Sequence, residues 1–263
     1  MHPEFLHIYG PISIQWYGLM IFIGILVFTY AILKDPQRSK LISNDQFFDL
    51  MALGILIGIV GGRLLFVLTN RGDINSFYEA IAIWDGGFSI LGSILGIIGV
   101  LPIYLRKKGI RIFELLDFFA IYAPLLQSIS RIGCFFAGCC YGCPTNLLWG
   151  VKCSGFCNLE KGHYLHPTQL YSALLLFIIY ILLRYWVRNT VKKPGQLTML
   201  YLILESVERF IVDFWRGDRE FLAKTGFLGT LSIHQCIAMG ICGAALIILC
   251  WIKVRAQQKD EFI

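Results

Sequence analysis

The sequence predicts an all-α integral membrane protein with about seven transmembrane helices and a small irregular head outside the membrane. Of its 263 residues, 57% are hydrophobic and only 15% are charged, whereas ordinary soluble domains carry about 25% charged residues. The mean hydropathy is +0.67. The apolar residues also fall in runs near the length of about 20 residues that a bilayer requires. These observations predict one polytopic membrane domain over residues 1–263.

Seven apolar runs, each bounded by charged or turn-forming residues, are the predicted spans. They are Trp16–Leu33, Phe47–Leu68, Phe88–Leu105, Ile112–Gly138, Tyr171–Val187, Leu197–Phe214 and Ile233–Ile252. The segment Cys139–His166, between the fourth and fifth runs, is too rich in Cys, Gly and Pro to be a span. It is the predicted extracytoplasmic head.

The basic residues set the expected orientation. Of the 23 Lys and Arg residues, 14 fall in one set of loops and the tail, and only 6 fall in the opposite set. Loops rich in Lys and Arg remain in the cytoplasm, so we expect the N-terminus outside and the C-terminus inside. The basic residues of the cytoplasmic loops therefore account for the net charge of +6, and no nucleic-acid partner is expected. Met1–Pro11 has no basic region typical of a signal peptide, so the first span is expected to be retained.

Three arginines fall within or at the ends of predicted spans: Arg63, Arg131 and Arg209. An arginine at mid-bilayer costs about 2.5–3.5 kcal/mol, so each needs a partner, water or a ligand. Arg209 belongs to a stripe whose helical spacing places its members on one face. Its members are Tyr201, Glu205, Arg209, Asp213 and Arg216. The stripe is either a structural Glu205–Arg209–Asp213 ladder or the wall of a polar cavity.

Arg131 opens a segment in which three glycines occur within ten positions, up to Gly142. This composition predicts that the helix breaks, and broken backbone at membrane depth must face protein or a wet cavity. An arginine beside exposed backbone donors is suited to bind a phosphate. Arg63 follows a series of small residues typical of close helix packing, and its role is equally open to a structural or a functional interpretation.

Six of the nine cysteines, from Cys134 to Cys157, occupy 24 residues. Three interpretations remain open: small buried thiols, a disulfide among Cys143, Cys153 and Cys157, or a metal site. No dinucleotide or P-loop fingerprint is present, so no cofactor is expected. Our expectation is that the site holds no metal.

Seven short blocks together identify a resemblance. In chain order they are Gln15–Met20, Gly61–Arg63, Trp84–Ser89, Arg131–Gly142, His166–Tyr171, Glu208–Phe214 and Leu231–Gln235. With this order, length and predicted topology, the chain resembles the bacterial prolipoprotein diacylglyceryl transferase family. The resemblance implies a multi-pass enzyme of the bacterial cytoplasmic (inner) membrane. It would transfer the diacylglyceryl group of phosphatidylglycerol to the lipobox cysteine thiol in prolipoprotein signal peptides, forming a thioether and releasing glycerol phosphate.

The resemblance also implies roles for particular residues. Arg131 would hold the phosphate of phosphatidylglycerol, and Gly142 and Arg63 are expected to bind the same lipid. Arg209 and Asp213, in the sixth predicted span, are expected to be catalytic, because positioned arginines stabilise a departing phosphate. Tyr17 is also expected to be catalytic, and its phenol would hydrogen-bond a substrate head group.

The sequence departs from the family pattern where a proton acceptor is needed. Many members carry Asn, Asn and Glu where this chain has Cys134, Ala137 and Cys139. A family histidine, the proposed base for the incoming thiol, is replaced by Leu91, and a common glutamate by Ser172. Asp213 or water would then accept the proton of the incoming thiol. The alternative is a covalent relay, in which a cysteine of this chain first carries the diacylglyceryl group.

Two other function classes remain open on these departures. One is a protein that binds or moves anionic lipid without transferase activity. The other is a thiol-redox membrane protein that uses the CxxC motif at Cys140–Cys143.

Reporter fusions test the orientation. An enzyme reporter that is active only in the cytoplasm should work when fused after Lys193 and fail when fused after Gly155, because these segments are predicted on opposite sides. The reverse pattern would invert the predicted topology.

Overall fold

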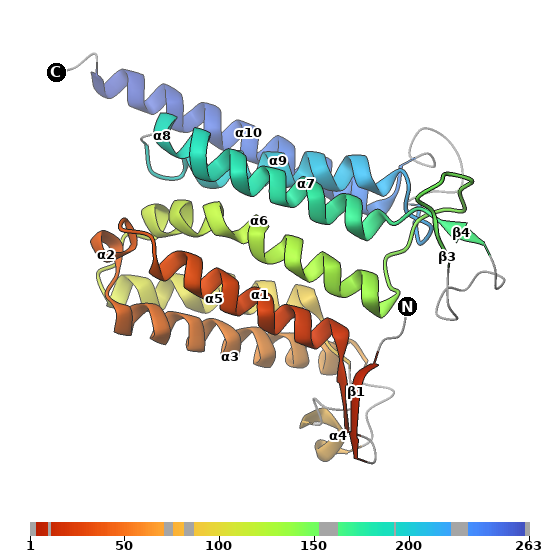
Figure 1. Cartoon of the computed structure of the whole chain (residues 1–263). Helices are drawn as coiled ribbons and strands as arrows, with labels where there is room; N and C mark the ends of the chain where they lie inside the picture. Colours follow the sequence, from red (N-terminus) through yellow and green to blue (C-terminus); the bar gives the residue numbers. More distant parts are fainter. Residues whose placement is uncertain are drawn as a thin grey trace. The chain divides into compact units, whose positions relative to one another are not determined.

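The computed structural model describes residues 4–9, 12–70, 76–81, 87–152, 163–191, 193–221 and 231–260. These residues are mostly helical (Figure 1). The chain forms two compact units, one made of residues 1–34 and 116–263 and the other of residues 35–115.

The helices of the first unit are α1 (Trp16–Leu33), α6 (Ile112–Ala137, whose first four residues belong to the second unit), α7 (Thr168–Leu182), α9 (Gln196–Asp213) and α10 (Ile233–Asp260). A π-helical turn, η2 (Leu183–Val187), and α8 (Arg188–Thr190) continue α7 to residue 190. Figure 1 shows that α6 ends, α7 begins, α9 ends and α10 begins at the same end of this unit. The connections that follow α6 and α9 are therefore brought together there.

Helices α6 and α9 are tied together by the carboxylate of Asp117. It accepts hydrogen bonds from the backbone nitrogens of Gly195 at 2.6 Å and Thr198 at 2.8 Å, and from the Thr198 hydroxyl at 2.6 Å. The first turn of a helix has unpaired N–H groups and favours negative charge. A side chain of α6 therefore fixes where α9 begins.

The second unit contains α2 (Arg38–Leu41), α3 (Asn44–Thr69), α4 (Phe77–Ile81) and α5 (Ile90–Lys107). A capping box of Ser43 and Gln46 begins α3. A Cβ atom on Gly61 would lie 2.6 Å from the backbone oxygen of Gly92 and 3.5 Å from the Cα of Gly96. The close helix packing that the small residues predicted is thus present between α3 and α5 at Gly61.

Six of the described helices are long and apolar enough to cross a membrane, rather than the predicted seven. They cover Trp16–Leu33, Asn44–Thr69, Ile90–Lys107, Ile112–Ala137, Thr168–Thr190 and Ile233–Arg255. Helix α9 occupies the position of the sixth predicted span but is not among them. Its 18 residues carry four charged side chains, which lower its hydropathy.

Two small antiparallel sheets accompany the helices, and the sequence did not predict them. Strand β1 (Glu4–Tyr9) pairs with β2 (Ile12–Gln15), which leads directly into α1. Strand β3 (Val151–Lys152) pairs with β4 (Tyr164–Leu165), inside the predicted head. Strands this short carry too few alternating positions to be recognised from a pattern.

The contact between α3 and α5 predicts a difference between two glycines of α3. Gly61→Ala should destabilise the protein by about 2 kcal/mol through overpacking and lower its unfolding temperature by about 4–8 °C. Gly54→Ala is the matched control, because no atom lies within 4 Å of its added Cβ, and it should be neutral or slightly stabilising. Thermal unfolding in detergent measures both, and equal shifts would contradict the assigned contact.

Candidate functional site

The chain reverses direction immediately after α6. Gly138 has a φ angle of 76° and Cys140 a φ angle of 58°, and Cys140 is the sole non-glycine residue with positive φ in the described part of the chain. A glycine in this conformation commonly ends a helix, but a cysteine in it is unusual. The predicted helix break is therefore present, and its backbone is held in an uncommon conformation.

The first turn of α7 holds this reversed segment. The Thr168 hydroxyl donates to the backbone oxygen of Cys140 at 2.8 Å, and the Gln169 side-chain nitrogen donates to that of Cys139 at 2.7 Å. Thr168 and Gln169 are each only 2% exposed. These buried hydrogen bonds fix the positions from which the two cysteine side chains project.

Gly142 lies where three segments cross. Its backbone nitrogen donates to the oxygen of His166 at 3.1 Å, and the next residue, Cys143, donates to the oxygen of Trp215 at 2.8 Å. A Cβ atom on Gly142 would lie 2.5 Å from the His166 oxygen and 2.8 Å from the Trp215 oxygen. This close approach of backbones explains the glycine without a ligand, and its role in binding lipid stays a prediction.

Arg131 on α6 and Arg209 on α9 are both half-buried and interact electrostatically. The structure thus brings together these two residues that the sequence singled out. Within the described residues neither guanidinium makes a hydrogen bond or ion pair. The charge of Arg216 also acts on Arg209, and the carboxylate of Glu208 acts on both Arg131 and Arg209. Such an arrangement concentrates positive charge and favours an anionic ligand.

The acidic residues of α9 contact neighbouring helices and not Arg209. Glu205 accepts a hydrogen bond from Gln127 of α6 at 2.7 Å, and Glu208 accepts one from Ser172 of α7 at 2.5 Å. The Glu205–Arg209–Asp213 ladder is therefore wrong as an interpretation of the stripe. Gln127 and Ser172 were not predicted as partners, because no sequence pattern pairs residues on different helices.

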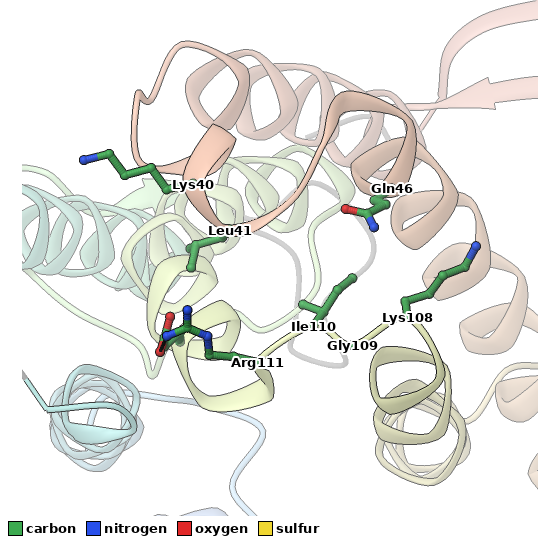
Figure 2. A pocket seen from close by; sticks show the side chains of 8 residues that line it. Lys40, Leu41, Gln46, Lys108, Gly109, Ile110 and Arg111 are labelled. Carbon is green, nitrogen blue, oxygen red and sulfur yellow. Dashed lines mark hydrogen bonds and ion pairs between the residues drawn. The ribbon is translucent and has the colours of Figure 1, made fainter.

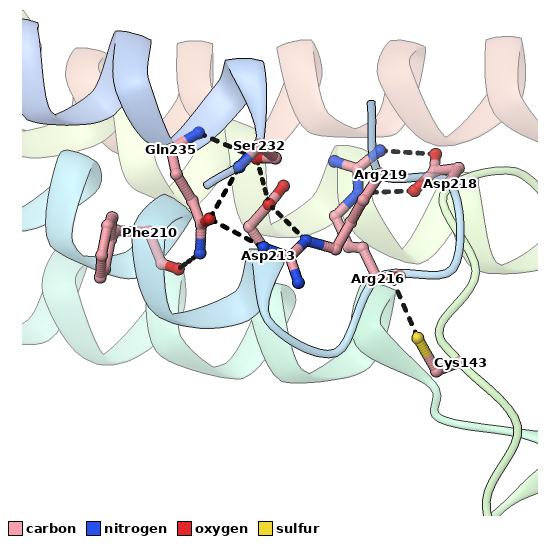
Figure 3. A network of polar contacts seen from close by, with 8 residues as sticks. All are labelled: Cys143, Phe210, Asp213, Arg216, Asp218, Arg219, Ser232 and Gln235. Atoms are coloured by element: carbon pink, nitrogen blue, oxygen red, sulfur yellow. Dashed lines mark hydrogen bonds and ion pairs between the residues drawn. The ribbon is translucent and has the colours of Figure 1, made fainter. Parts of the chain in front are cut away.

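Asp213 connects the end of α9 to the start of α10. It is 1% exposed, and its Oδ2 accepts a hydrogen bond from the Ser232 hydroxyl at 2.5 Å and lies 3.4 Å from Nε of Arg219 (Figure 3). Ser232 also accepts from the backbone nitrogen of Gln235, in the manner of a helix cap. These contacts favour a positioning role for Asp213 over the catalytic role expected from the resemblance.

Arg216 forms an ion pair with Asp218. Its Nε and Nη2 donate to the two carboxylate oxygens of Asp218 at 2.8 and 2.7 Å (Figure 3). This bidentate hydrogen bonding raises the pKa of Arg216. Arg216 is 7% exposed, so a buried positive charge is fixed beside the site while Arg131 and Arg209 retain their donors.

Tyr17, in the first turn of α1, lies beside the end of α6. Its hydroxyl hydrogen-bonds the side chain of Ser130, and its environment includes the thiols of Cys134 and Cys139. The ring of the preceding Trp16 stacks on Phe136 with 4.7 Å between centroids. Tyr17 is 39% exposed and is therefore available to a ligand near Arg131.

Arg63 belongs to the other compact unit and is bonded to backbone. Its Nη1 donates to the oxygen of Gly87 at 2.6 Å and its Nη2 to that of Glu79 at 2.5 Å. These contacts favour its structural interpretation, in which it holds the segment between α3 and α5. Leu91 on α5 is 60% exposed. The neighbouring motif residues 84–86 lie outside the described residues.

Three cysteines converge at the break after α6. The sulfur atoms of Cys134, Cys139 and Cys140 all lie within 4.8 Å of one another. Hydrogen bonding with Cys134 and Cys139 lowers the pKa of Cys140, assisted by the charges of Arg216 and Arg131, whereas hydrogen bonding with Cys134 raises the pKa of Cys139. Cys143 donates to the backbone oxygen of Arg216. Two members of the predicted disulfide group, Cys153 and Cys157, lie outside the described residues.

A separate pocket of about 250 Å³ lies in the second unit (Figure 2). Its lining residues are Lys40, Leu41, Gln46, Lys108, Gly109, Ile110, Arg111 and Glu114. Arg111 pairs with Glu114 at 2.7 Å, and none of the predicted site residues lines it. The pocket belongs to the basic loops on the side that the sequence predicts to be cytoplasmic.

Comparisons with known proteins agree on one family. The sequence model described as prolipoprotein diacylglyceryl transferase matches residues 3–251. A protein of Clostridium tetani (strain Massachusetts / E88) named phosphatidylglycerol–prolipoprotein diacylglyceryl transferase is 35% identical, over 91% of this chain and 93% of its own length. Proteins of the same name from Finegoldia magna and Thermotoga maritima are 31% and 30% identical. They cover 95% and 80% of this chain, and 96% and 73% of their own lengths.

The Asp213 contacts predict that its main contribution is to stability. Asp213→Asn should lower the free energy of unfolding by about 1.5–3 kcal/mol, because a hydrogen-bonded buried charge is lost. Glu114→Gln is the control, since the Arg111 side chain of that pair is 79% exposed and such pairs contribute less than about 1 kcal/mol. Thermal unfolding measures both variants. An Asp213→Asn protein that keeps its unfolding temperature but loses activity would restore the catalytic assignment.

Proposed function

This chain belongs to the prolipoprotein diacylglyceryl transferase family, and on that premise we propose that it attaches the diacylglyceryl group of phosphatidylglycerol to the lipobox cysteine thiol of prolipoproteins. It is a transferase of lipoprotein biosynthesis and a multi-pass protein of the inner membrane. We also propose which residues bind and activate the lipid, and on which side of the membrane they lie.

The observation that carries the residue assignment is the pair formed by Arg131 and Arg209. Two like charges interact on adjacent helices, and neither has a hydrogen-bond or ion-pair partner among the described residues. A buried guanidinium without a partner is costly, and a phosphate can accept bidentate hydrogen bonds from arginine. The phosphodiester of phosphatidylglycerol would supply the missing counter-charge.

The reaction requires stabilisation of a leaving phosphate. The sulfur of the acceptor thiolate forms a bond to the terminal glyceryl carbon, the carbon–oxygen bond to phosphate breaks, and glycerol phosphate departs with that electron pair. Donors aimed at the developing phosphate charge lower the barrier, which is the role proposed for Arg131 and Arg209. Tyr17, beside the same helix end, is proposed to hydrogen-bond the lipid head group.

We further propose that α9 is the seventh span, lined by protein on its charged face. Glu205 bonds to α6, Glu208 to α7 and Asp213 to the start of α10, so each carboxylate has a hydrogen-bond partner inside the first unit. Ionisable residues in spans characteristically face the bundle interior. The N-terminus and the Cys139–His166 segment are proposed to lie outside, where they would meet the exported signal peptides.

A second candidate function rests on Leu91. This aliphatic side chain cannot accept a proton, and it replaces the histidine of the family pattern. A protein that binds or moves anionic lipid through the arginine pair, without transfer, would need no base. The activity assay below separates this candidate from the transferase.

Substitution of Arg131 tests the transferase proposal. Purified protein, phosphatidylglycerol and a lipobox peptide should give a diacylglyceryl thioether detectable by mass spectrometry. Arg131→Lys should lower the rate of thioether formation by about 100-fold or more, because the ammonium of lysine cannot form the two parallel hydrogen bonds that a guanidinium forms with a phosphate. Leu91→His should change the rate only modestly.

Arg255→Lys, at the exposed end of α10, is the matched control and should retain activity. Comparable expression must be shown for each variant. Inactive wild-type protein together with an active Leu91→His variant would refute the proposal and support the lipid-binding candidate.

A further inference from the structure

The cluster of Cys134, Cys139 and Cys140 has no role in the mechanism proposed above. We propose that these three cysteines bind one thiophilic divalent cation, such as Zn²⁺, and leave its fourth coordination position open to the thiol of the prolipoprotein. The second half of this inference rests on the proposed transferase function.

The separations of the sulfur atoms suit such a site. A tetrahedral Zn²⁺ site with Zn–S bonds near 2.3 Å places its sulfur atoms about 3.8 Å apart. In this chain the three sulfur atoms already lie within 4.8 Å of one another, so closure around a cation requires shifts of less than about 1 Å per sulfur. Three protein ligands and one open position are typical of catalytic zinc sites.

The surroundings hold the ligands in place. Hydrogen bonds from Thr168 and Gln169 fix the backbone oxygens of Cys140 and Cys139, and fixed backbone orients ligand side chains. The uncommon φ angle of 58° at Cys140 directs its side chain back toward α6. Backbone strain of this kind persists where the surrounding contacts impose it, and it clusters at functional sites.

Charge and access also favour the site. Arg131 and Arg216 both act on Cys140, so their positive charge offsets the negative charge of bound thiolates. Cys134 is buried, Cys140 is half-buried and Cys139 is exposed. The site is therefore open on the Cys139 side. Gln169 Oε1, whose amide group contacts the Cys139 backbone, is buried and has no hydrogen-bond partner among the described residues, so it can accept from a bound group.

Such a site would supply a way to deprotonate the acceptor thiol. Coordination to a divalent cation deprotonates a thiol, so the lipobox thiol would bind the open position and release its proton to water. Its sulfur would then form the bond to the glyceryl carbon as the carbon–oxygen bond to phosphate breaks. No electron is gained or lost by the cation. Arg131 and Arg209 would act on the leaving phosphate, and the cation on the nucleophile.

Metal content and cobalt spectroscopy of the full-length protein in detergent test the site. One Zn²⁺ per chain is expected by elemental analysis, and replacement with Co²⁺ should give thiolate charge-transfer absorption and the intense visible bands of tetrahedral cobalt. Cys139→Ser and Cys140→Ser should each weaken Co²⁺ binding by at least about tenfold, since even changes outside the ligand set cost 10–100-fold. Cys250→Ser, an exposed thiol on α10, is the matched control and should bind Co²⁺ as wild type does.

A lipobox peptide tests the open position. The cysteine peptide should change the visible bands of the Co²⁺ protein as a fourth thiolate binds, whereas the same peptide with serine should not. A wild-type protein without bound metal or thiolate absorption overturns the site, as does a disulfide between any two of the three cysteines in thiol-blocked membranes. Unchanged bands with the cysteine peptide overturn the substrate step.

The transferase assay keeps the two proposals distinguishable. Thioether formation by metal-free protein would refute the role of the cation in transfer and leave the proposed function intact. Metal and peptide binding without thioether formation from phosphatidylglycerol would support the site and refute the transferase.

Discussion

The repulsion between Arg131 and Arg209 is the constraint on which the rest of the site depends. Two half-buried guanidinium groups remain close only if their helices are held together by other contacts. Asp117 of α6 binds the start of α9, and Gln127 of α6 binds Glu205 midway along it. These hydrogen bonds between α6 and α9 offset the repulsion, so the arginine pair is built before any substrate arrives.

The same contacts explain why α9 can be too polar to resemble a span and still belong inside a membrane protein. A polar side chain facing lipid would have no partner, but those of α9 bond to three neighbouring elements. Glu205, Glu208 and Asp213 each use a different one. Hydrogen bonds to neighbouring elements hold α9 in place, whereas apolar surface holds the other long helices. The polar face of α9 therefore points toward α6, α7 and α10.

The sequence predicted the features that depend on local pattern. Long apolar runs predicted most ends of the long helices to within about five residues, although α10 continues beyond the predicted Ile252 to Asp260. Intramembrane arginine identified Arg131 and Arg209 because charge is costly there. The role of Asp213 depends on Ser232, which lies in a different element, so its spacing on α9 suggested a ladder that the structure does not contain. The cysteine cluster depends on the φ angles of Gly138 and Cys140, which no periodicity encodes. The sequence therefore singled out the cysteine-rich segment but left three interpretations open, and the chain reversal is what brings Cys134, Cys139 and Cys140 together.

The ion pairs around the arginines leave a specific charge unbalanced. Asp218 pairs with Arg216, and Asp213 lies against Arg219, so each of these arginines already has a carboxylate partner. Glu208 acts on both Arg131 and Arg209, but neither guanidinium has an ion-pair partner among the described residues. The arginine pair therefore presents positive charge that a negatively charged phosphodiester can offset. A neutral lipid would leave that charge uncompensated, whereas an anionic phospholipid completes the balance. A preference for an anionic lipid over a neutral one therefore follows from the guanidinium donors that Arg131 and Arg209 leave without a protein partner.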